Sequence, residues 1–278
     1  MTFSIVARSG DRETWGVAVA SKFLAVGSAV PAAVAGIGAI ATQADANVAY
    51  KGLALAHLDE GATAQVALDR LLEDDEGREH RQVGIVDLEG GSATYTGRSC
   101  FDWAGGVAEK DVAIQGNILA GSEVVEAMKA SWDGSHGEPD LSRRLLSALQ
   151  AGDGAGGDKR GRQSAALLVV RDEAGYGGRD DVAVDLRVDD HEQPCMELER
   201  LLDLNDLYLT ASADAEKVEV TAELRAELDE RAGRLGHPDF SAWVGTENFE
   251  MRVDDGASPA WVDEKVLHIL RTRSGENA

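Results

Sequence analysis

Short apolar runs separated by turn-forming residues dominate the first fifty positions of the chain. Residues 2–8 (TFSIVAR) and 14–21 (TWGVAVAS) are rich in Val, Ile and aromatic residues, and SGDRE between them is typical of a turn. We expect these two runs to pair as an antiparallel hairpin. Residues 36–43 (GIGAIATQ) predict a third strand whose small residues would let another layer approach closely. The small-residue segment 23–36 before it is predicted to be irregular or a buried strand.

The next part of the chain has helical spacing. Between residues 50 and 72 the apolar positions fit two helices broken at Gly61, with Thr63 as the N-cap of the second. Residues 81–97 then predict another hairpin, because two strand-like runs flank the turn-forming residues Glu89-Gly90-Gly91.

The second half of the main region contains both periodicities. Residues 111–121 (DVAIQGNILAG) predict a strand that ends near Gln115, followed by a tight turn. Helices are expected from the N-cap Ser122 to Trp132 and over residues 139–152, where a proline precedes the helix and a glycine follows it. Strands are predicted at 163–172 and 181–190, and helical spacing resumes at 194–209.

The order of these elements indicates the fold class. Strands, then helices, then strands again are typical of a layered α+β fold in which two sheets lie between helix layers. A βαβ dinucleotide fold is disfavoured because the early strands are joined by hairpins. We expect this domain over residues 1–212. Residues 213–278 predict a small helical appendage, which would be marginal alone and would dock on the main body.

Composition and charge restrict the function classes. The 278 residues are 44% hydrophobic, enough for a sizeable core, and the formal net charge is -23. This acidity excludes a general nucleic-acid binder and is typical of the solvated surface of proteins from halophilic organisms. Cys100 and Cys195 suggest neither a disulfide framework nor a zinc site. No apolar run reaches the roughly 20 residues of a membrane span, so we expect a cytoplasmic protein with no membrane partner.

The N-terminus carries the first candidate chemistry. Thr2 follows only Met1 and opens a predicted strand. Once Met1 is removed, the α-amine of Thr2, with a pKa of about 8, can act as a general base on the hydroxyl of the same residue. Nucleophile and base would then coincide in one amino acid, although any protein can carry threonine at position two.

Several further blocks of sequence share a resemblance with a known family. In chain order these blocks are MTFSIVAR, GVAVASKFLAVGSAVP, GAIATQADAN, QGNILAG, AGGDKRGRQSAALLVV and DLRVDDH. Over residues 2–210 the chain resembles the uncharacterised Ntn-hydrolase-like family, domain of unknown function 1028. The tail, with WVGTENFEMRVDDG, resembles the peptidoglycan-binding-like module at the C-terminus of some members. The resemblance implies a four-layer αββα sandwich with its nucleophile, here Thr2, at the exposed end of the first strand, and no cofactor.

Polar residues at the ends of the early strands are candidates to assist Thr2. Ser21 and Lys22 end the second strand, and a lysine near the N-terminal amine would lower the pKa of that amine, unless it simply reaches into solvent. Gln43, Asp45 and Asn47 lie at the end of the third strand and could bind polar groups of a substrate or orient the amine of Thr2. Turn formation or helix capping explains Asp45 and Asn47 equally well.

Two glycine-containing segments offer further groups. Gly116 and Asn117 are expected at a strand-to-helix turn, where N–H groups could form an oxyanion hole, although this pair is also common in ordinary turns. Residues 155–164 (AGGDKRGRQS) lack the spacing of a phosphate-binding loop and lead into a strand. There, Asp158 and Arg160 could recognise a substrate carboxylate or form a structural ion pair.

Other candidates are weaker. Asp189, Asp190 and His191 could suggest a metal-dependent hydrolase, but three contiguous residues cannot all face one ion, so we expect a turn and helix cap and no metal. Cys100 is expected to be a small buried residue beside Trp103. Members of the family often have histidine at the position of Gly106, so any mechanism that needs this histidine is in doubt here.

The leading hypothesis is therefore an N-terminal-nucleophile amidohydrolase, an enzyme that cleaves C–N bonds with Thr2. Its substrate would be a small amide or an acylated amino acid, bound by Ser21, Gln43, Asn47, Asp158 and Arg160, while Lys22, Gly116 and Asn117 assist catalysis. The alternative is a non-catalytic αββα scaffold whose C-terminal module binds a ligand or partner. By analogy with other Ntn proteins we expect a homo-oligomer.

Overall fold

The computed structural model describes residues 2–256 and 258–275, which form a mixed α+β protein with antiparallel sheets. The chain divides into two compact units between Leu202 and Asp203. This division lies inside α6 (Pro194–Tyr208), a continuous helix whose first part belongs to the first unit and whose end belongs to the second. The sequence predicts the boundary after residue 212.

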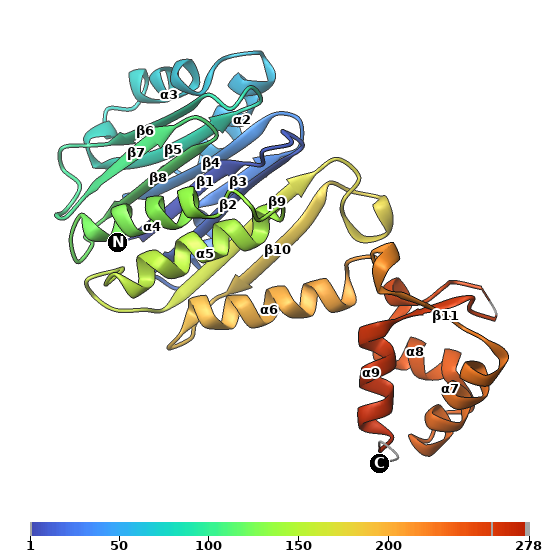
Figure 1. Ribbon diagram of the computed structural model, residues 1–278. Helices are drawn as coiled ribbons and strands as arrows, with labels where there is room; N and C mark the ends of the chain where they lie inside the picture. The colour runs from blue at the N-terminus through green and yellow to red at the C-terminus, as the bar shows by residue number, and fades with distance from the viewer. Residues whose placement is uncertain (1, 257, 276–278) are drawn as a thin grey trace. The chain divides into compact units, whose positions relative to one another are not determined.

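A six-stranded sheet forms the centre of the first unit (Figure 1), in the order β10-β9-β2-β1-β8-β7 with every neighbouring pair antiparallel. The predicted opening hairpin is confirmed as β1 and β2. The predicted strand near residue 112 continues to Asn117, and β7, with two glycines and little apolar pattern, was not predicted. The strands are β1 (Thr2–Arg8), β2 (Thr14–Ser21), β7 (Gly105–Glu109), β8 (Val112–Asn117), β9 (Ser164–Arg171) and β10 (Val182–Val188).

A second, four-stranded antiparallel sheet has the order β3-β4-β5-β6. Its β5 and β6 are the predicted hairpin of residues 81–97. The small-residue segment before β4 forms the short helix α1 (Val26–Ala29) and strand β3. The strands are β3 (Pro31–Val34), β4 (Gly38–Ala44), β5 (Arg81–Asp87) and β6 (Ser92–Thr96).

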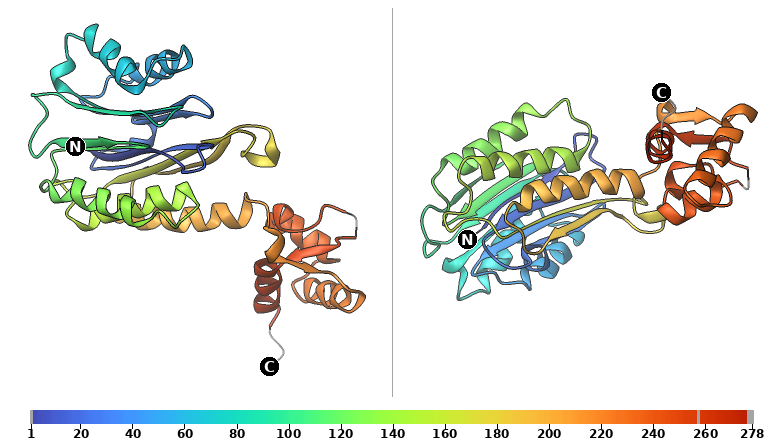
Figure 2. Two further views of the ribbon diagram at one scale, coloured as in Figure 1. Left: turned by 45° about the horizontal axis from the view of Figure 1, so that its top comes forward. Right: turned by 90° about the horizontal axis from the view of Figure 1, so that it is seen from below.

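Helices cover the outer face of each sheet, as the left view of Figure 2 shows. The predicted pair α2 (Tyr50–Asp59) and α3 (Ala64–Glu73) packs on the four-stranded sheet, and the Thr63 hydroxyl caps α3 as expected. On the other sheet lie α4 (Glu123–Gly134), α5 (Leu141–Gly154) and the first part of α6. Ser122 stands at the N-cap of α4, but its side chain makes no capping hydrogen bond.

Alternation of side chains divides the apolar core of this unit. In β1, Phe3, Ile5 and Ala7 pack against the helices, while Val6 lies in a separate apolar layer between the two sheets. Side chains of a strand point alternately to opposite faces, so Thr2 and Ser4 share the inter-sheet face with Val6. The inter-sheet face of β1 is therefore apolar along part of its length and polar toward its N-terminal end.

The second unit combines helices with a two-stranded sheet around an aromatic cluster of Phe240, Trp243 and Phe249. Its elements are β11 (Lys217–Glu219), α7 (Ala222–Arg234), α8 (Phe240–Glu247), β12 (Trp261–Asp263) and α9 (Glu264–Arg273). Short 3-10 helices occur in both units at Arg78–His80, Tyr176–Gly178, Asp214–Glu216 and Glu250–Arg252.

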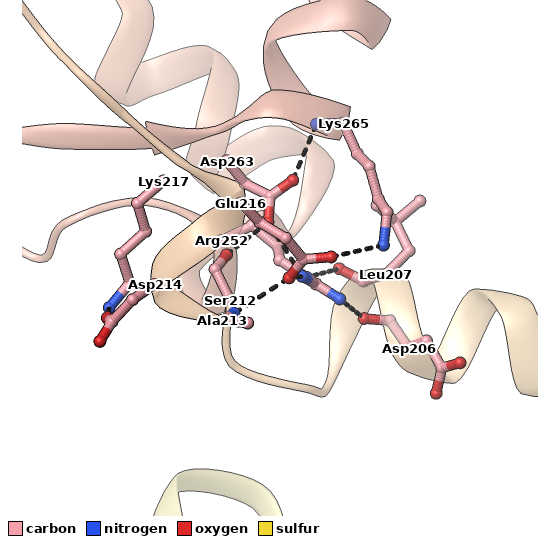
Figure 3. Close-up of polar contacts among 10 residues, drawn as sticks. All are labelled: Asp206, Leu207, Ser212, Ala213, Asp214, Glu216, Lys217, Arg252, Asp263 and Lys265. Atoms are coloured by element: carbon pink, nitrogen blue, oxygen red, sulfur yellow. Dashed lines mark hydrogen bonds and ion pairs between the residues drawn. The ribbon is translucent and has the colours of Figure 1, made fainter. Parts of the chain in front are cut away.

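A buried ion pair ties the second unit together (Figure 3). The Arg252 guanidinium lies 2.9 Å from the Asp263 carboxylate and also contacts Glu216 at 3.1 Å. It donates in addition to the backbone carbonyls of Asp206 and Leu207.

Across residues 2–256 and 258–275, no helix combines the length and the apolar composition needed to cross a membrane.

Candidate functional site

The start of β1 meets the ends of β2, β4 and β8, and polar side chains gather at this point. Thr2 pairs with Asn117 across β1 and β8, and its Oγ1 lies 3.1 Å from the Oγ of Ser21. The Gln43 Nε2 donates to the Thr2 carbonyl at 3.3 Å, and the Asn117 Nδ2 approaches the same oxygen at 3.5 Å. All four residues are buried. The structure therefore brings together Thr2, Ser21, Gln43 and Asn117, which the sequence nominates separately.

Gln82 on β5 joins two of these side chains. Its Oε1 accepts hydrogen bonds from Gln43 Nε2 and from Asn117 Nδ2, both at 2.8 Å. Its Nε2 donates to the Gly116 carbonyl at 2.7 Å and to the Thr96 hydroxyl at 2.8 Å. A fully buried amide is thus satisfied at both ends, and it connects the four-stranded sheet to the six-stranded sheet beside Thr2.

The hydrogen-bond network continues from Thr2 toward the interior. Ser4 Oγ donates to Gln43 Oε1 and accepts from Gln115 Nε2, both at 2.7 Å. The Gln115 amide lies over Gly84, where an added Cβ would be only 2.1 Å from Gln115 Oε1. Gly84 therefore makes the space in which a glutamine amide fits between the two sheets.

A cavity of about 360 Å³ opens at the Thr2 end of the sheets. Asn117, the strand partner of Thr2, contributes to its wall. Other wall residues include Asp45, His80, Cys100, Phe101 and Arg160. The cavity combines apolar surface with hydrogen-bonding and charged groups, which is the usual composition of a small-molecule site.

Arg81 fixes one wall of this cavity. Its guanidinium donates to the Asp45 carbonyl at 2.7 Å, lies 3.0 Å from the Asp45 carboxylate, and binds the Asp75 carboxylate at 2.8 Å. The hydrogen bond from Arg81 holds the pKa of Asp75 well below its usual value, and burial beside that carboxylate raises the pKa of Tyr50. Asp75 is therefore ionised at neutral pH and anchors Arg81.

The segment with Gly116 and Asn117 differs from its prediction. Both residues lie within β8 and not at a strand-to-helix turn, which begins only at Ile118. Gly116 pairs with Phe3 on one side and with Gly105 on the other, so its backbone lies inside the sheet. The Asn117 side chain, in contrast, faces Thr2. The sequence placed the end of this strand too early because Gly-Asn is a frequent turn pair.

Asp158 and Arg160 have different surroundings. The Asp158 carboxylate is buried and accepts the backbone N–H groups of Lys22 at 2.7 Å and of Arg160 at 2.8 Å, so it ties its loop to the end of β2. The Arg160 guanidinium contacts Asp158 at 3.3 Å, is 47% exposed and lines the cavity. The exposed Lys22 directs its ammonium to the Arg162 carbonyl at 3.2 Å. Its predicted effect on the N-terminal amine stays a prediction.

Asn47 and the candidate metal residues have local partners. The Asn47 Oδ1 accepts the Ala49 N–H at 3.2 Å in the turn before α2. The Asp190 carboxylate accepts from Gln163, and the His191 Nδ1 accepts from the Gln193 N–H. In the part of the chain that the structure describes, no group of three or more His, Cys, Asp or Glu could hold a metal ion.

Two positions near the cavity depart from expectation. Cys100 is only partly buried and lines the cavity, with its Sγ donating to the Arg81 carbonyl at 3.4 Å, so it is less buried than predicted. Burial still raises the pKa of the Cys100 thiol, which disfavours the thiolate. Gly106 lies in β7, where a Cβ would be 2.7 Å from the Ile114 carbonyl oxygen. A histidine at this position would require the strands to shift.

Gln82, Ser4 and Gln115 were not singled out from the sequence, although a signal exists. Every second residue of these buried strands faces the other sheet. The inward positions are Thr2-Ser4-Val6 in β1, Ala39-Ala41-Gln43 in β4, Gln82-Gly84-Val86 in β5 and Ala113-Gln115-Asn117 in β8. In each of these strands the polar side chains lie toward the end of the sheets at which Thr2 stands. A comparison of alternate residues across the strands would therefore have revealed the cluster.

Comparison with known proteins places this fold in a family. Residues 2–198 match the family of unknown function DUF1028. The crystal structure of protein SPO2555 from Silicibacter pomeroyi, described as DUF1028, is similar, with a TM-score of 0.66 and 32% sequence identity over 77% of this chain and 90% of that chain. No curated protein matches the chain. The chain belongs to the DUF1028 family of unknown function.

Proposed function

We propose that the first unit is an N-terminal-nucleophile amidohydrolase with the αββα sandwich of Ntn hydrolases. The observation that carries the proposal is the position of Thr2. Its hydroxyl lies at the start of a central strand, 3.1 Å from Ser21 Oγ, and its strand partner Asn117 lines the cavity. Removal of Met1 would place a free amine and a hydroxyl on one residue at this point.

The reaction proceeds in two steps. The Thr2 Oγ attacks the amide carbonyl carbon while the α-amine takes the hydroxyl proton. The C–N bond then breaks, the leaving nitrogen receives that proton, and the acyl group remains as an ester on Oγ. Water, deprotonated by the same amine, attacks the ester carbon, releases the carboxylic acid and restores the hydroxyl.

Asn117 is the better placed of the two predicted oxyanion donors. The Gly116 carbonyl is bound by Gln82, and the backbone of this residue lies inside the sheet. The Asn117 Nδ2 has one strong hydrogen bond, to Gln82 at 2.8 Å, and directs its other hydrogen toward Thr2 over 3.5 Å. That second hydrogen, held in this direction by the bond to Gln82, can donate to a negative charge that develops next to Thr2.

The cavity favours a small substrate with a carboxylate. Its volume of about 360 Å³ suits a small amide or an acylated amino acid better than a folded protein. Arg160 offers a half-exposed guanidinium at its wall, and guanidinium groups bind carboxylates through paired hydrogen bonds. The second unit is proposed to be the peptidoglycan-binding-like module that the tail sequence resembles.

Intact mass and a library of small amides test the proposal. We expect purified protein to lack Met1, the wild type to release amine from at least one acylated amino acid, and Thr2→Ala to be inactive. Alanine is also a small residue that permits Met1 removal, so this variant keeps the free amine and loses only the hydroxyl. Hydrolysis that survives in Thr2→Ala, or complete retention of Met1 in folded protein, would contradict the proposal.

A further inference from the structure

We propose that Gln82 is a positioning residue that orients the amides of Asn117 and Gln43 toward Thr2; this inference rests on the function proposed for Thr2. Gln82 comes from the four-stranded sheet, whereas Thr2 and Asn117 belong to the six-stranded sheet. Its side chain therefore reaches across the inter-sheet space to contact the site from the opposite layer.

A backbone carbonyl determines which way the Gln82 amide points. The Gly116 oxygen can only accept a hydrogen bond, so the Gln82 atom 2.7 Å from it must be the nitrogen. The Gly105 carbonyl, 3.3 Å from the same nitrogen, requires the same orientation. The Gln82 oxygen must then face away from these carbonyls, toward Gln43 and Asn117.

The orientation of Gln82 sets the orientation of its neighbours in turn. Because Gln82 Oε1 can only accept, the atoms that face it at 2.8 Å must be the amide nitrogens of Gln43 and Asn117. Each nitrogen carries a second hydrogen, and each lies within 3.5 Å of the Thr2 carbonyl. One buried oxygen thus presents two amide N–H groups to the residue proposed as the nucleophile.

Apolar packing alone would not select glutamine at this position. Gly84 and Val86 occupy the equivalent inward positions further along β5, and Val86 belongs to the apolar inter-sheet layer. An amide buried among such neighbours is unfavourable unless all its hydrogen bonds form. Gln82 does form them, and the result is a fixed direction for the two amides beside Thr2.

The test compares three variants by acylation of Thr2. The probe is β-butyrolactone: Thr2 Oγ bonds to the lactone carbonyl carbon, the ring C–O bond breaks, and the released alkoxide takes the hydroxyl proton through the α-amine. Peptide mass mapping locates and times the adduct. We expect Gln82→Met to react about tenfold more slowly than wild type, the effect of misplacing one hydrogen bond. Gln150→Met, which removes a partly buried glutamine amide bonded to Glu199 and outside the network around Thr2, should react at the wild-type rate.

The Gln82→Glu variant separates positioning from structural support. A protonated carboxyl at this site can still donate to the Gly116 carbonyl and accept from Asn117, whereas an ionised carboxylate cannot donate. At each pH the rate of this variant is divided by the wild-type rate. We expect that ratio to approach one in acid and to fall as pH rises. Equal rates for Gln82→Met and Gln150→Met, or a ratio that does not change with pH, would overturn the inference.

A second measurement distinguishes failure of this inference from failure of the proposed function. If wild type with a free Thr2 amine takes up no probe, the proposed nucleophile is wrong. The side-chain amide signals of Asn117 in a nitrogen-15 NMR spectrum then decide the role of Gln82. A shift of these signals in Gln82→Met that is absent in Gln150→Met supports the positioning role, and unchanged signals refute it.

Discussion

Replacing Arg252 by methionine should selectively destabilise the second unit. The Arg252 side chain is 3% exposed and contacts the Asp263 carboxylate, which is completely buried. It also contacts Glu216 and two backbone carbonyls (Figure 3). Methionine fills part of the same volume but supplies no donor, so the substitution leaves a carboxylate inside the unit without its cation.

The magnitude follows from the partners that Asp263 retains. Removing one member of a buried ion pair costs about 3–5 kcal/mol, because the remaining charge is desolvated without compensation. Asp263 keeps hydrogen bonds from the Ser212 hydroxyl and from the Lys265 N–H at 2.8 Å. These donors offset part of the cost, so we expect the lower end of the range, about 3 kcal/mol.

Hydrogen exchange of the full chain, followed by mass spectrometry, measures this loss for each unit separately. Peptides from β12 and α9 should lose protection in Arg252→Met, while peptides from β1 and β8 should not change. The matched control is Arg273→Met, which breaks a half-exposed ion pair with Glu247 and should cost no more than about 1 kcal/mol. Equal effects of the two substitutions would refute the reasoning, since burial would then make no difference.

Three further predictions concern a helix cap, a close approach and pH. Thr63→Ala removes the hydroxyl that accepts the Val66 N–H, and should lower the free energy of unfolding by about 1 kcal/mol in urea titrations. Gly84→Ala should cost about 1–3 kcal/mol in the same assay because its methyl group would meet the buried Gln115 amide, whereas Gly134→Ala, with open space around it, should not destabilise. The hydrogen bond from Lys265 lowers the pKa of Glu216 to about 2. The ionised Glu216 therefore stabilises the second unit fully above the ordinary pKa of a glutamate, and this stabilisation disappears as pH falls toward 2. Hydrogen-exchange protection factors of the second unit, which correct for the intrinsic pH dependence of amide exchange, should therefore fall across this acid range in wild type and less so in Glu216→Gln; an equal fall would argue against this contribution.

Local pattern predicted the parts of the fold that local interactions determine. The β1–β2 hairpin, the β5–β6 hairpin and the pair α2 and α3 with its cap at Thr63 all follow from short-range signals. Strand β7 was missed because its residues, Gly105–Glu109, have little apolar alternation and are held mainly by pairing with β8. Helix α1 was missed because four small or branched residues give no helical period.

The candidate site was predictable only in part, for a similar reason. Thr2, Ser21, Gln43 and Asn117 stand near strand ends, and the hydrogen bonds across the two sheets bring these ends together. Lys22 lies beside Ser21 in sequence, yet its side chain extends to the Arg162 carbonyl. Lys22 is the first residue after β2, where the chain leaves the strand, so nearness in sequence does not place two side chains in one site.

The inter-sheet layer explains why a site can form at this end of the first unit. Further along, Val6, Ala41, Val86 and Ala113 pack without polar atoms and hold the sheets together. Toward Thr2 the same alternate positions carry hydroxyl and amide groups. Burying these groups is favourable only if each finds its partner, and their mutual hydrogen bonds permit one arrangement of donors and acceptors. Apolar packing thus holds the two sheets in register, and that register fixes the direction of the amides around Thr2.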